Sequence, residues 1–334
     1  MSQITVFKDA TMTTYYSHPI RTWSLCAFII LCLFSCQQEP QQEESALKVS
    51  SGRVERLENF SSELVPPRTI DIWLPEGYSS EKNYSVLYMH DGQMLYDSTT
   101  TWNGQEWEVD EVVGELISQD KIDDVIAVGV YNSGAERHAE YFPQKPFESL
   151  EESVQDSLFN LGRSNDQPLF ASDLRADGYL AFLVKELKPY IDENYATNPD
   201  ASHTFVAGSS MGGLISMYAI CEYPQVFGGA ACLSTHWVGI IEPENNPIPA
   251  AFVSYLAENL PEPGQNKLYF DYGTETLDAL YEPFQLQVDS VMEMKGYTAV
   301  NWVTQKFPGA NHSEIAWAKR LHIPVSFLLG DTAD

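Results

Sequence analysis

The chain has 334 residues, of which 44% are hydrophobic and 12% aromatic, and its formal net charge is −28. This apolar content is sufficient for a sizeable core and excludes a disordered chain. The strong negative charge disfavours contact with phosphate backbones and anionic lipid surfaces, so no nucleic acid is expected as a partner.

The N-terminal region has the pattern of an export signal. An apolar run, WSLCAFIILCLFSC at 23–36, follows Arg21 and has the length of a signal-peptide core, which is too short to span a bilayer comfortably. It ends in L-F-S-C before polar residues, as a bacterial lipobox does. We predict a signal peptide over 1–36, lipidation of Cys36, and a protein held only by this lipid anchor in the bacterial cell envelope, facing the periplasm or the surface. Phe34 departs from the small residue usual there, so an ordinary export signal or a short anchor remains the alternative.

The rest of the chain is predicted to be a tether followed by one domain. Residues 37–50 are rich in Gln and Glu and predict the tether, and no repeat or linker divides 51–331. Cys221 and Cys232 lie in apolar runs and predict buried side chains rather than a disulfide or a metal pair. No CxxC, HExxH or HxH motif occurs, so neither a metal nor a cofactor is predicted.

Short apolar runs predict the strands of a sheet. The run 68–74 alternates between polar and apolar residues, as a half-buried antiparallel strand does. The other runs are nearly continuous, which is typical of parallel strands covered on both faces. They span 85–90, 125–131, 204–208, 230–234, 267–273 and 301–307.

Helical patterns separate these runs, at 109–118, 178–195, 281–295 and 313–329. We expect Pro189 and Pro324 to kink or break the second and the fourth. Alternating strands and helices predict an α/β fold, with a mostly parallel sheet and helices on both faces. Two irregular stretches, 132–175 and 235–266, are predicted insertions over the carboxyl ends of the strands, where they would shape a ligand site.

The motif GSSMG at 208–212 follows a predicted strand and precedes a predicted helix. In this context G-x-S-x-G predicts a nucleophile elbow, in which Ser210 sits on a strained turn above the sheet. Gly208 and Gly212 would avoid clashes with the neighbouring strand and helix, and the helix N-terminus would favour developing negative charge. A Gly/Ser helix cap is the alternative interpretation.

A serine nucleophile needs a base, and in this chain order the acid precedes the histidine. His312 lies in FPGANHSEIAW, a loop between the last predicted strand and the last helix, and is the predicted base. His236 comes too soon after the sixth run, and His322 lies within a mostly apolar helical segment. The predicted acid is Asp278, with Glu275 as the alternative, because both follow the strand 267–273.

The oxyanion formed by attack on an acyl carbon needs two backbone donors. The amide of Met211 is one candidate, and that of Gly92 or Gln93, in the loop MHDGQMLYD, is the other. Tyr141 and Trp237 are predicted pocket walls, with ordinary packing as the alternative. The net charge disfavours acidic substrates, although Arg137 or Arg175 could pair with a carboxylate.

Taken together, these segments resemble the Putative esterase (esterase D-like) family of α/β-hydrolases. The resemblance rests on LYMHDGQMLYD, VYNSGAERHAEYFP, FVAGSSMGGLISMYAICEYPQVFGGAACLSTHW, YFDYGTETLDALYEPFQ and GANHSEIAWAKRL, and covers roughly 50–330. It implies the α/β-hydrolase fold, no metal, Ser210 as nucleophile and His312 as base. The acid matches less well, because Thr276 occupies the acid position of the family's usual G-x-x-D.

The combined expectation is a serine carboxylic ester hydrolase that acts through an acyl-enzyme. Its expected partner is a small-molecule or carbohydrate ester, such as an acylated carbohydrate or a siderophore-like ester, outside the cytoplasm. The alternatives are an acyltransferase with the same three residues and a non-catalytic ligand-binding lipoprotein.

Overall fold

The computed structural model describes residues 42–44, 47–164, 167–240, 245–264 and 266–330, which belong to one compact unit. The predicted signal peptide, with Cys36, lies outside the described residues, as does half of the predicted tether. In the described part of the chain, no helix combines the length and apolar character that crossing a membrane requires.

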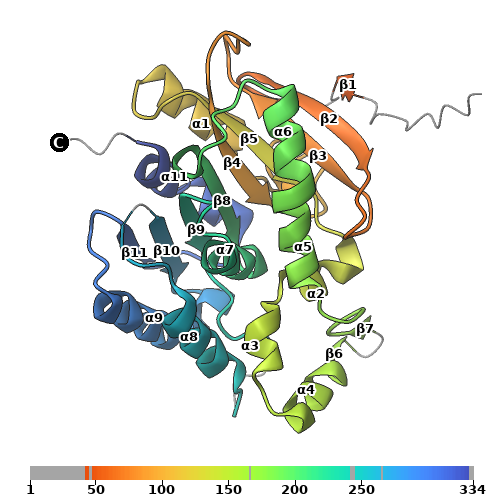
Figure 1. Cartoon of the computed structure of the whole chain (residues 1–334), viewed down its shortest axis with the longest axis vertical. Coiled ribbons are helices and arrows are strands. Elements are labelled where there is room, and N and C mark those ends of the chain that lie inside the picture. Colours follow the sequence, from red (N-terminus) through yellow and green to blue (C-terminus); the bar gives the residue numbers. More distant parts are fainter. Residues whose placement is uncertain (1–41, 45–46, 165–166, 241–244, 265, 331–334) are drawn as a thin grey trace, which may run out of the picture. The chain divides into compact units, whose positions relative to one another are not determined.

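Nine strands of the described chain form one sheet, in the order β1-β2-β3-β5-β4-β8-β9-β10-β11 (Figure 1). Neighbouring strands from β5 to β11 are parallel, while β1, β2 and β3 make antiparallel pairs at one edge. The strands are β1 (Gln42–Glu44), β2 (Arg53–Phe60), β3 (Arg68–Leu74), β4 (Ser85–His90), β5 (Val125–Val130), β8 (Thr204–Ser209), β9 (Gly229–Leu233), β10 (Lys267–Gly273) and β11 (Trp302–Phe307).

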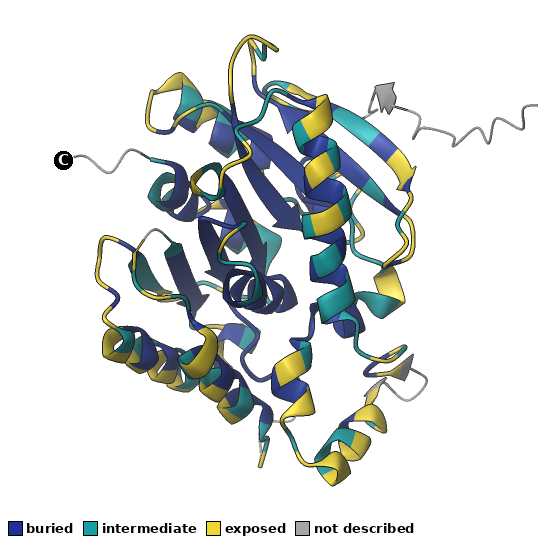
Figure 2. Ribbon diagram, in the orientation of Figure 1, coloured by how far each residue is buried: buried dark blue, intermediate teal, exposed yellow. Residues whose placement is uncertain are grey.

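Helices cover both faces of the sheet, and the alternation of side chains along each strand divides the core in two. In β4, Val86 and Tyr88 join one apolar cluster while Leu87 and Met89 join the other, because successive residues point to opposite faces. The central strands are buried, β2 and β11 are only partly so, and helices such as α6 (Lys188–Asn194) and α9 (Glu282–Lys295) expose their outer sides (Figure 2). The first cluster includes residues of α5 (Ala176–Phe182), α6, α7 (Met211–Glu222), α8 (Ile248–Asn259) and α9, and the second includes residues of α1 (Val109–Ser118), α10 (Glu314–Ala318) and α11 (His322–Leu329).

The strands predicted from apolar runs agree with the sheet to within one residue at each end. β2 is absent from the prediction, and its register explains why. Its buried residues Val54, Leu57 and Phe60 are three apart. Val54 and Leu57 pack in different apolar clusters, on opposite faces of the sheet, and a register shift between Leu57 and Phe60 displaces the pairing with β3. A spacing of three is not the alternation by which strands are recognised.

The two prolines act differently from one another. The helix predicted over 178–195 continues through Pro189, but a π-helical segment, η3 (Leu183–Leu187), lies just before it between α5 and α6. A wider turn there relieves the clash of the ring with the preceding carbonyl. The segment 313–329 breaks before Pro324, which lies in the first turn of α11, where a missing N–H costs nothing.

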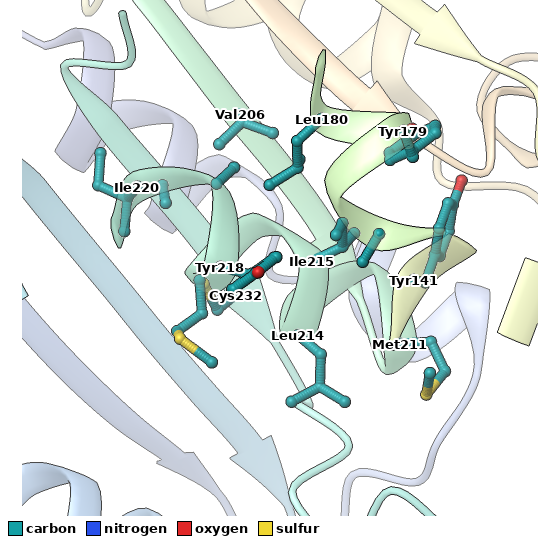
Figure 3. Close-up of a cluster of buried hydrophobic side chains, with 14 of the residues drawn as sticks. Tyr141, Tyr179, Leu180, Val206, Met211, Leu214, Ile215, Tyr218, Ile220 and Cys232 are labelled. Carbon is teal, nitrogen blue, oxygen red and sulfur yellow. The ribbon is translucent and has the colours of Figure 1, made fainter. Parts of the chain in front are cut away.

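Helix α7, which follows the G-x-S-x-G motif, is buried on all sides. Eleven of its twelve residues are buried, and Leu214, Ile215 and Tyr218 lie within the apolar cluster shown in Figure 3. A helix that is apolar all round packs at the centre of a fold. The turn at its N-terminus is therefore anchored to a helix that is itself fixed by packing.

The predicted insertions contain short elements. The first holds α2 (Arg137–Tyr141), α3 (Gln144–Glu148), α4 (Glu152–Phe159) and the hairpin β6 (Gly162–Ser164) and β7 (Gln167–Pro168), and the second holds α8. Helix α2 contacts α5 and α7, and α3 contacts α8. The first insertion is thus packed against the helix that carries the serine motif.

The domain begins earlier than the predicted boundary at residue 51. Leu47 and Val49 pack against the second apolar cluster, and the Ser50 N–H donates to Asp110 at 2.6 Å. The Lys48 N–H donates to Asp97 at 3.0 Å. The last residues of the predicted tether are therefore part of the folded unit.

Asp110, which accepts the Ser50 N–H, has a buried carboxyl group. Burial, together with a hydrogen bond to the Glu111 carboxyl, raises the pKa of Asp110 to about 7. Its folded pKa lies above the unfolded value, so the fold binds a proton that the unfolded chain releases. This contribution to stability is therefore present at acidic pH and is lost as the pH rises through about 7.

We expect Asp110→Asn to mimic the protonated carboxyl. The free energy of unfolding, measured by urea denaturation, should decrease from pH 5.5 to pH 8 in the wild type. It should decrease less in the variant. The exposed Asp120→Asn, beyond the C-terminus of α1, removes the same charge as a control. A variant with the wild-type pH dependence would contradict the assignment.

Candidate active site

Ser210 lies on a sharp turn between β8 and α7. Its backbone has φ 57° and ψ −119°, a conformation that a residue with a Cβ rarely adopts and that is held by the surrounding structure. The Ser210 N–H donates to Leu233 at 2.9 Å. A Cβ on Gly208 would come within 2.8 Å of the Gly212 backbone, so glycine is required there, whereas a Cβ on Gly212 would make only ordinary contacts.

His312 and Asp278 form a close pair. The Nδ1 atom of His312 is 2.5 Å from a carboxylate oxygen of Asp278, and Asp278 is fully buried. His312 comes from the loop between β11 and α10, and Asp278 from the 3-10 helix η5 (Thr276–Leu280) after β10. This contact fixes the imidazole so that Nε2 is left for a reacting group.

The second oxygen of Asp278 accepts two further hydrogen bonds. The Ser234 hydroxyl and the Gly273 N–H both donate to it at 2.6 Å. Burial opposes ionisation, but these donors and His312 outweigh it and hold the pKa of Asp278 below its usual value. Asp278 is therefore an anion at neutral pH, as a partner of imidazolium must be.

The alternative acid, Glu275, is exposed to solvent. The hydroxyl of Thr276, the residue after Glu275, instead accepts the backbone N–H of His312 at 3.0 Å. Asp271 is buried within β10 and pairs with Arg320 at 2.8 Å. Of the predicted acids, the structure therefore brings only Asp278 to the imidazole.

Ser210 and His312 line the same cleft, which has a volume of about 940 Å³. Met211 and Gln93, two of the predicted oxyanion donors, also line it. The third candidate, Gly92, packs behind the loop, where a Cβ would lie 2.5 Å from the backbone of Gly129. Of the three predicted donors, Met211 and Gln93 are therefore the two whose residues line the cleft.

Asp91 and Arg137 form an ion pair in the cleft wall. The guanidinium contacts both carboxylate oxygens, at 2.6 and 2.7 Å, and Asn132 donates to one of them. Burial opposes the charge on Asp91, yet Arg137 holds the pKa of that carboxyl below its usual value. Arg137 is therefore already paired, and Arg175 is not among the described residues that line the cleft.

The prediction that Tyr141 and Trp237 form walls of the pocket was wrong. Both are buried, at 0% and 1% exposure, and neither is among the described lining residues. The Tyr141 hydroxyl accepts the Asp91 N–H at 3.3 Å, and the Trp237 indole donates to Gln285 at 2.9 Å. Both side chains are therefore packed in the interior, and Tyr141 contacts the site through the Asp91 backbone.

The cleft wall contains residues that sequence reasoning did not single out. Trp102 is 83% exposed and lines the cleft together with Asn103 and Gln105, in the loop before α1. His236, set aside as a base, also lines it. Within the described ranges, no group of three His, Cys, Asp or Glu side chains could hold a metal ion.

Comparisons with known proteins agree with this architecture. A family model described as "Putative esterase" matches residues 61–323. The uncharacterized protein YjcH of Bacillus subtilis is 26% identical over 179 residues, which cover 53% of this chain and only 60% of YjcH.

Two solved structures have the same fold. A ferulic acid esterase from Anaeromyces mucronatus aligns with a TM-score of 0.56 and 16% identity, covering 87% of this chain and 96% of its own. The enterobactin esterase of Shigella flexneri aligns with a TM-score of 0.58 and 16% identity, covering 87% and 63%. The fold is that of the α/β-hydrolases.

We expect Asp278→Asn to lower kcat for p-nitrophenyl acetate by about a hundredfold to ten-thousandfold, because the amide cannot stabilise imidazolium and favours the wrong tautomer. Glu275→Gln, the matched control, should stay within twofold of wild type. The opposite result would assign the acid to Glu275.

Proposed function

Since the chain belongs to the Putative esterase family and is a serine esterase, we propose that it hydrolyses neutral carboxylic esters through an acyl-enzyme on Ser210. The observation that carries this proposal is the His312–Asp278 contact in the cleft that Ser210 also lines. A binding protein would have no use for a buried carboxylate held as an anion against an imidazole, because burying that charge costs stability.

The reaction proceeds in two balanced steps. The Ser210 oxygen attacks the ester carbonyl, its proton passes to Nε2 of His312, and the carbonyl oxygen becomes an oxyanion facing the Met211 and Gln93 amides. The carbon–oxygen bond to the alcohol then breaks, and His312 returns the proton to the leaving alcohol. Water repeats the sequence and releases the acid from Ser210.

The charge of the cleft favours a neutral substrate. Its described lining holds three side chains with a full charge, Asp91, Glu314 and Arg137, so two negative charges face one positive charge. Arg137 is paired with Asp91, and Asn103 donates to Glu314 at 2.9 Å. An anionic ligand would find no unpaired cation among these groups, which supports an acylated carbohydrate or a neutral aryl ester over an anionic siderophore.

Trp102 is suited to bind a ring of such a substrate. Its loop is braced by hydrogen bonds from Thr101 to Ser98 at 3.0 Å and from Asn103 to Glu314 across to α10. An exposed indole on a braced loop costs little entropy when a sugar or aryl ring packs on it. We assign Trp102 as the platform for the ring-bearing part of the ester.

To test the acyl-enzyme, wild-type protein is mixed with p-nitrophenyl acetate and followed by stopped flow and intact-protein mass spectrometry. We expect a labelled species one acetyl group heavier, and its loss in Ser210→Ala. Ser290→Ala, which removes a hydroxyl on α9, is the control. A Ser210→Ala protein with the wild-type rate would refute the proposal.

Trp102→Ala should raise KM about fivefold to tenfold for feruloylated or acetylated sugars and leave kcat near wild type, because only ring packing is lost. KM for ethyl acetate, which has no ring, should not change. The control is Met294→Ala, which removes another side chain that is largely exposed and lies outside the cleft. A higher kcat/KM for a catecholate triester than for every neutral ester would contradict the substrate class.

A further inference from the structure

The loop that carries the predicted oxyanion donor Gln93 is tied to the loop after the neighbouring strand. Asp91, the first residue after β4, accepts two hydrogen bonds from Arg137, at 2.6 and 2.7 Å, and one from the Asn132 side chain at 2.7 Å. The Gln93 side-chain oxygen accepts the backbone N–H of Asn132 at 3.2 Å. Four hydrogen bonds therefore join the loop after β4 to the loop after β5.

Asp91 has a backbone conformation that depends on such support. Its φ of 58° and ψ of 44° lie in the left-handed region, which is strained for a residue with a side chain, although Asp enters it more readily than most. The turn that follows, η1 (Gly92–Met94), closes with a hydrogen bond from the Met94 N–H to the Asp91 carbonyl at 2.9 Å. This bond does not use the Gln93 N–H, but the same turn sets its direction. The orientation of the predicted donor thus depends on what holds Asp91 in place.

The Asp91 carboxylate also lies close to the first turn of α7. A Cβ on Gly212 would lie 3.4 Å from one of the carboxylate oxygens, and Gly212 follows Met211, the other predicted donor. The Asp91 side chain is only 13% exposed, so water screens its charge weakly. An uncompensated negative charge here would repel the negative charge that develops on an oxyanion.

Arg137 supplies the counter-ion, and its position is fixed by its own helix. The guanidinium binds both carboxylate oxygens, as a planar fork does, and lies 5.1 Å from the centre of the Tyr141 ring. Tyr141 belongs to the same helix, α2, and its hydroxyl accepts the Asp91 N–H at 3.3 Å. One helix therefore holds both the carboxylate and the backbone of Asp91.

We propose that Arg137 is a positioning residue, which holds Asp91 so that the Gln93 amide faces the oxyanion. It also cancels the charge of this carboxylate beside the Met211 amide. The inference rests on the proposed function, in which acylation and deacylation each form an oxyanion. In this role Arg137 takes no proton and does not contact the ester. Its loss should therefore affect kcat more than KM, because the oxyanion develops only on the way to the transition state.

Arg137→Met removes the cation and tests this role. For p-nitrophenyl acetate we expect kcat to fall about tenfold to a hundredfold, no more than the loss of one oxyanion donor costs, with KM within about twofold. In stopped flow, the rate constants of the burst and of the steady state should fall together, because both steps form an oxyanion. Loss of folded protein would instead lower only the burst amplitude, and unchanged rate constants would overturn the inference.

A matched control lies at the other end of the same two strands. Lys82 precedes β4 and Asp124 precedes β5, and the two side chains form an ion pair at 2.7 Å. Lys82→Met breaks this pair and should leave kcat within about twofold of wild type. If Lys82→Met lowered kcat as much as Arg137→Met, general loosening of the strands would explain both, and the inference would be overturned.

A double variant separates the charge from the hydrogen bonds. In Asp91→Asn with Arg137→Met no carboxylate is left without its counter-ion, while the Asn oxygen can still accept the Asn132 side-chain amide. We expect kcat several-fold above that of Arg137→Met alone. A double variant no faster than Arg137→Met would overturn the neutralising role of Arg137.

Gln93→Met tests the link between the loops and leaves the ion pair intact. It removes the oxygen that accepts the Asn132 N–H and keeps the backbone amide, so kcat should fall several-fold. A rate within about twofold of wild type would overturn the positioning role, and this variant decides the matter if Arg137→Met does not fold by circular dichroism. A Ser210→Ala protein with the wild-type rate would instead refute the proposed function itself.

Discussion

A buried carboxylate that lacks a lysine or arginine partner keeps its charge only if hydrogen bonds compensate for the lost water, and Asp278 is such a group. Its donors come from His312 after β11, Ser234 after β9 and Gly273 at the end of β10. These are the carboxyl ends of three neighbouring parallel strands. The charge of the acid therefore depends on the register of the sheet, and a displaced strand would remove both the charge and the orientation of His312.

A second buried carboxylate shows how the charges are divided. Asp271 pairs with Arg320, and the same guanidinium donates to Ser234 at 2.9 Å. Ser234 in turn donates to Asp278. The arginine thus reaches the predicted acid only through a neutral hydroxyl, which leaves the full negative charge of Asp278 to stabilise an imidazolium on His312.

The sequence predicted the parts of the site that are local in the chain. The strand, turn and helix around Ser210 form one continuous pattern, and His312 occupies the one loop that the chain order allows. Choosing Asp278 over Glu275 required the path of η5, which apolar periodicity does not report. Tyr141 and Trp237 were misjudged as pocket walls because an aromatic side chain near a site packs equally well beneath it.

The electrostatics of the chain separate the substrate of the proposed reaction from its products. The protein has a net charge of −28. This charge neither attracts nor repels a neutral ester, but it repels the carboxylate released from Ser210. The cation that could retain this product, Arg137, is held by Asp91 at 2.6 Å. The alcohol product carries no charge and leaves with the first step. The ion pair between Arg137 and Asp91 thereby keeps the cleft from binding the carboxylate that the proposed reaction forms.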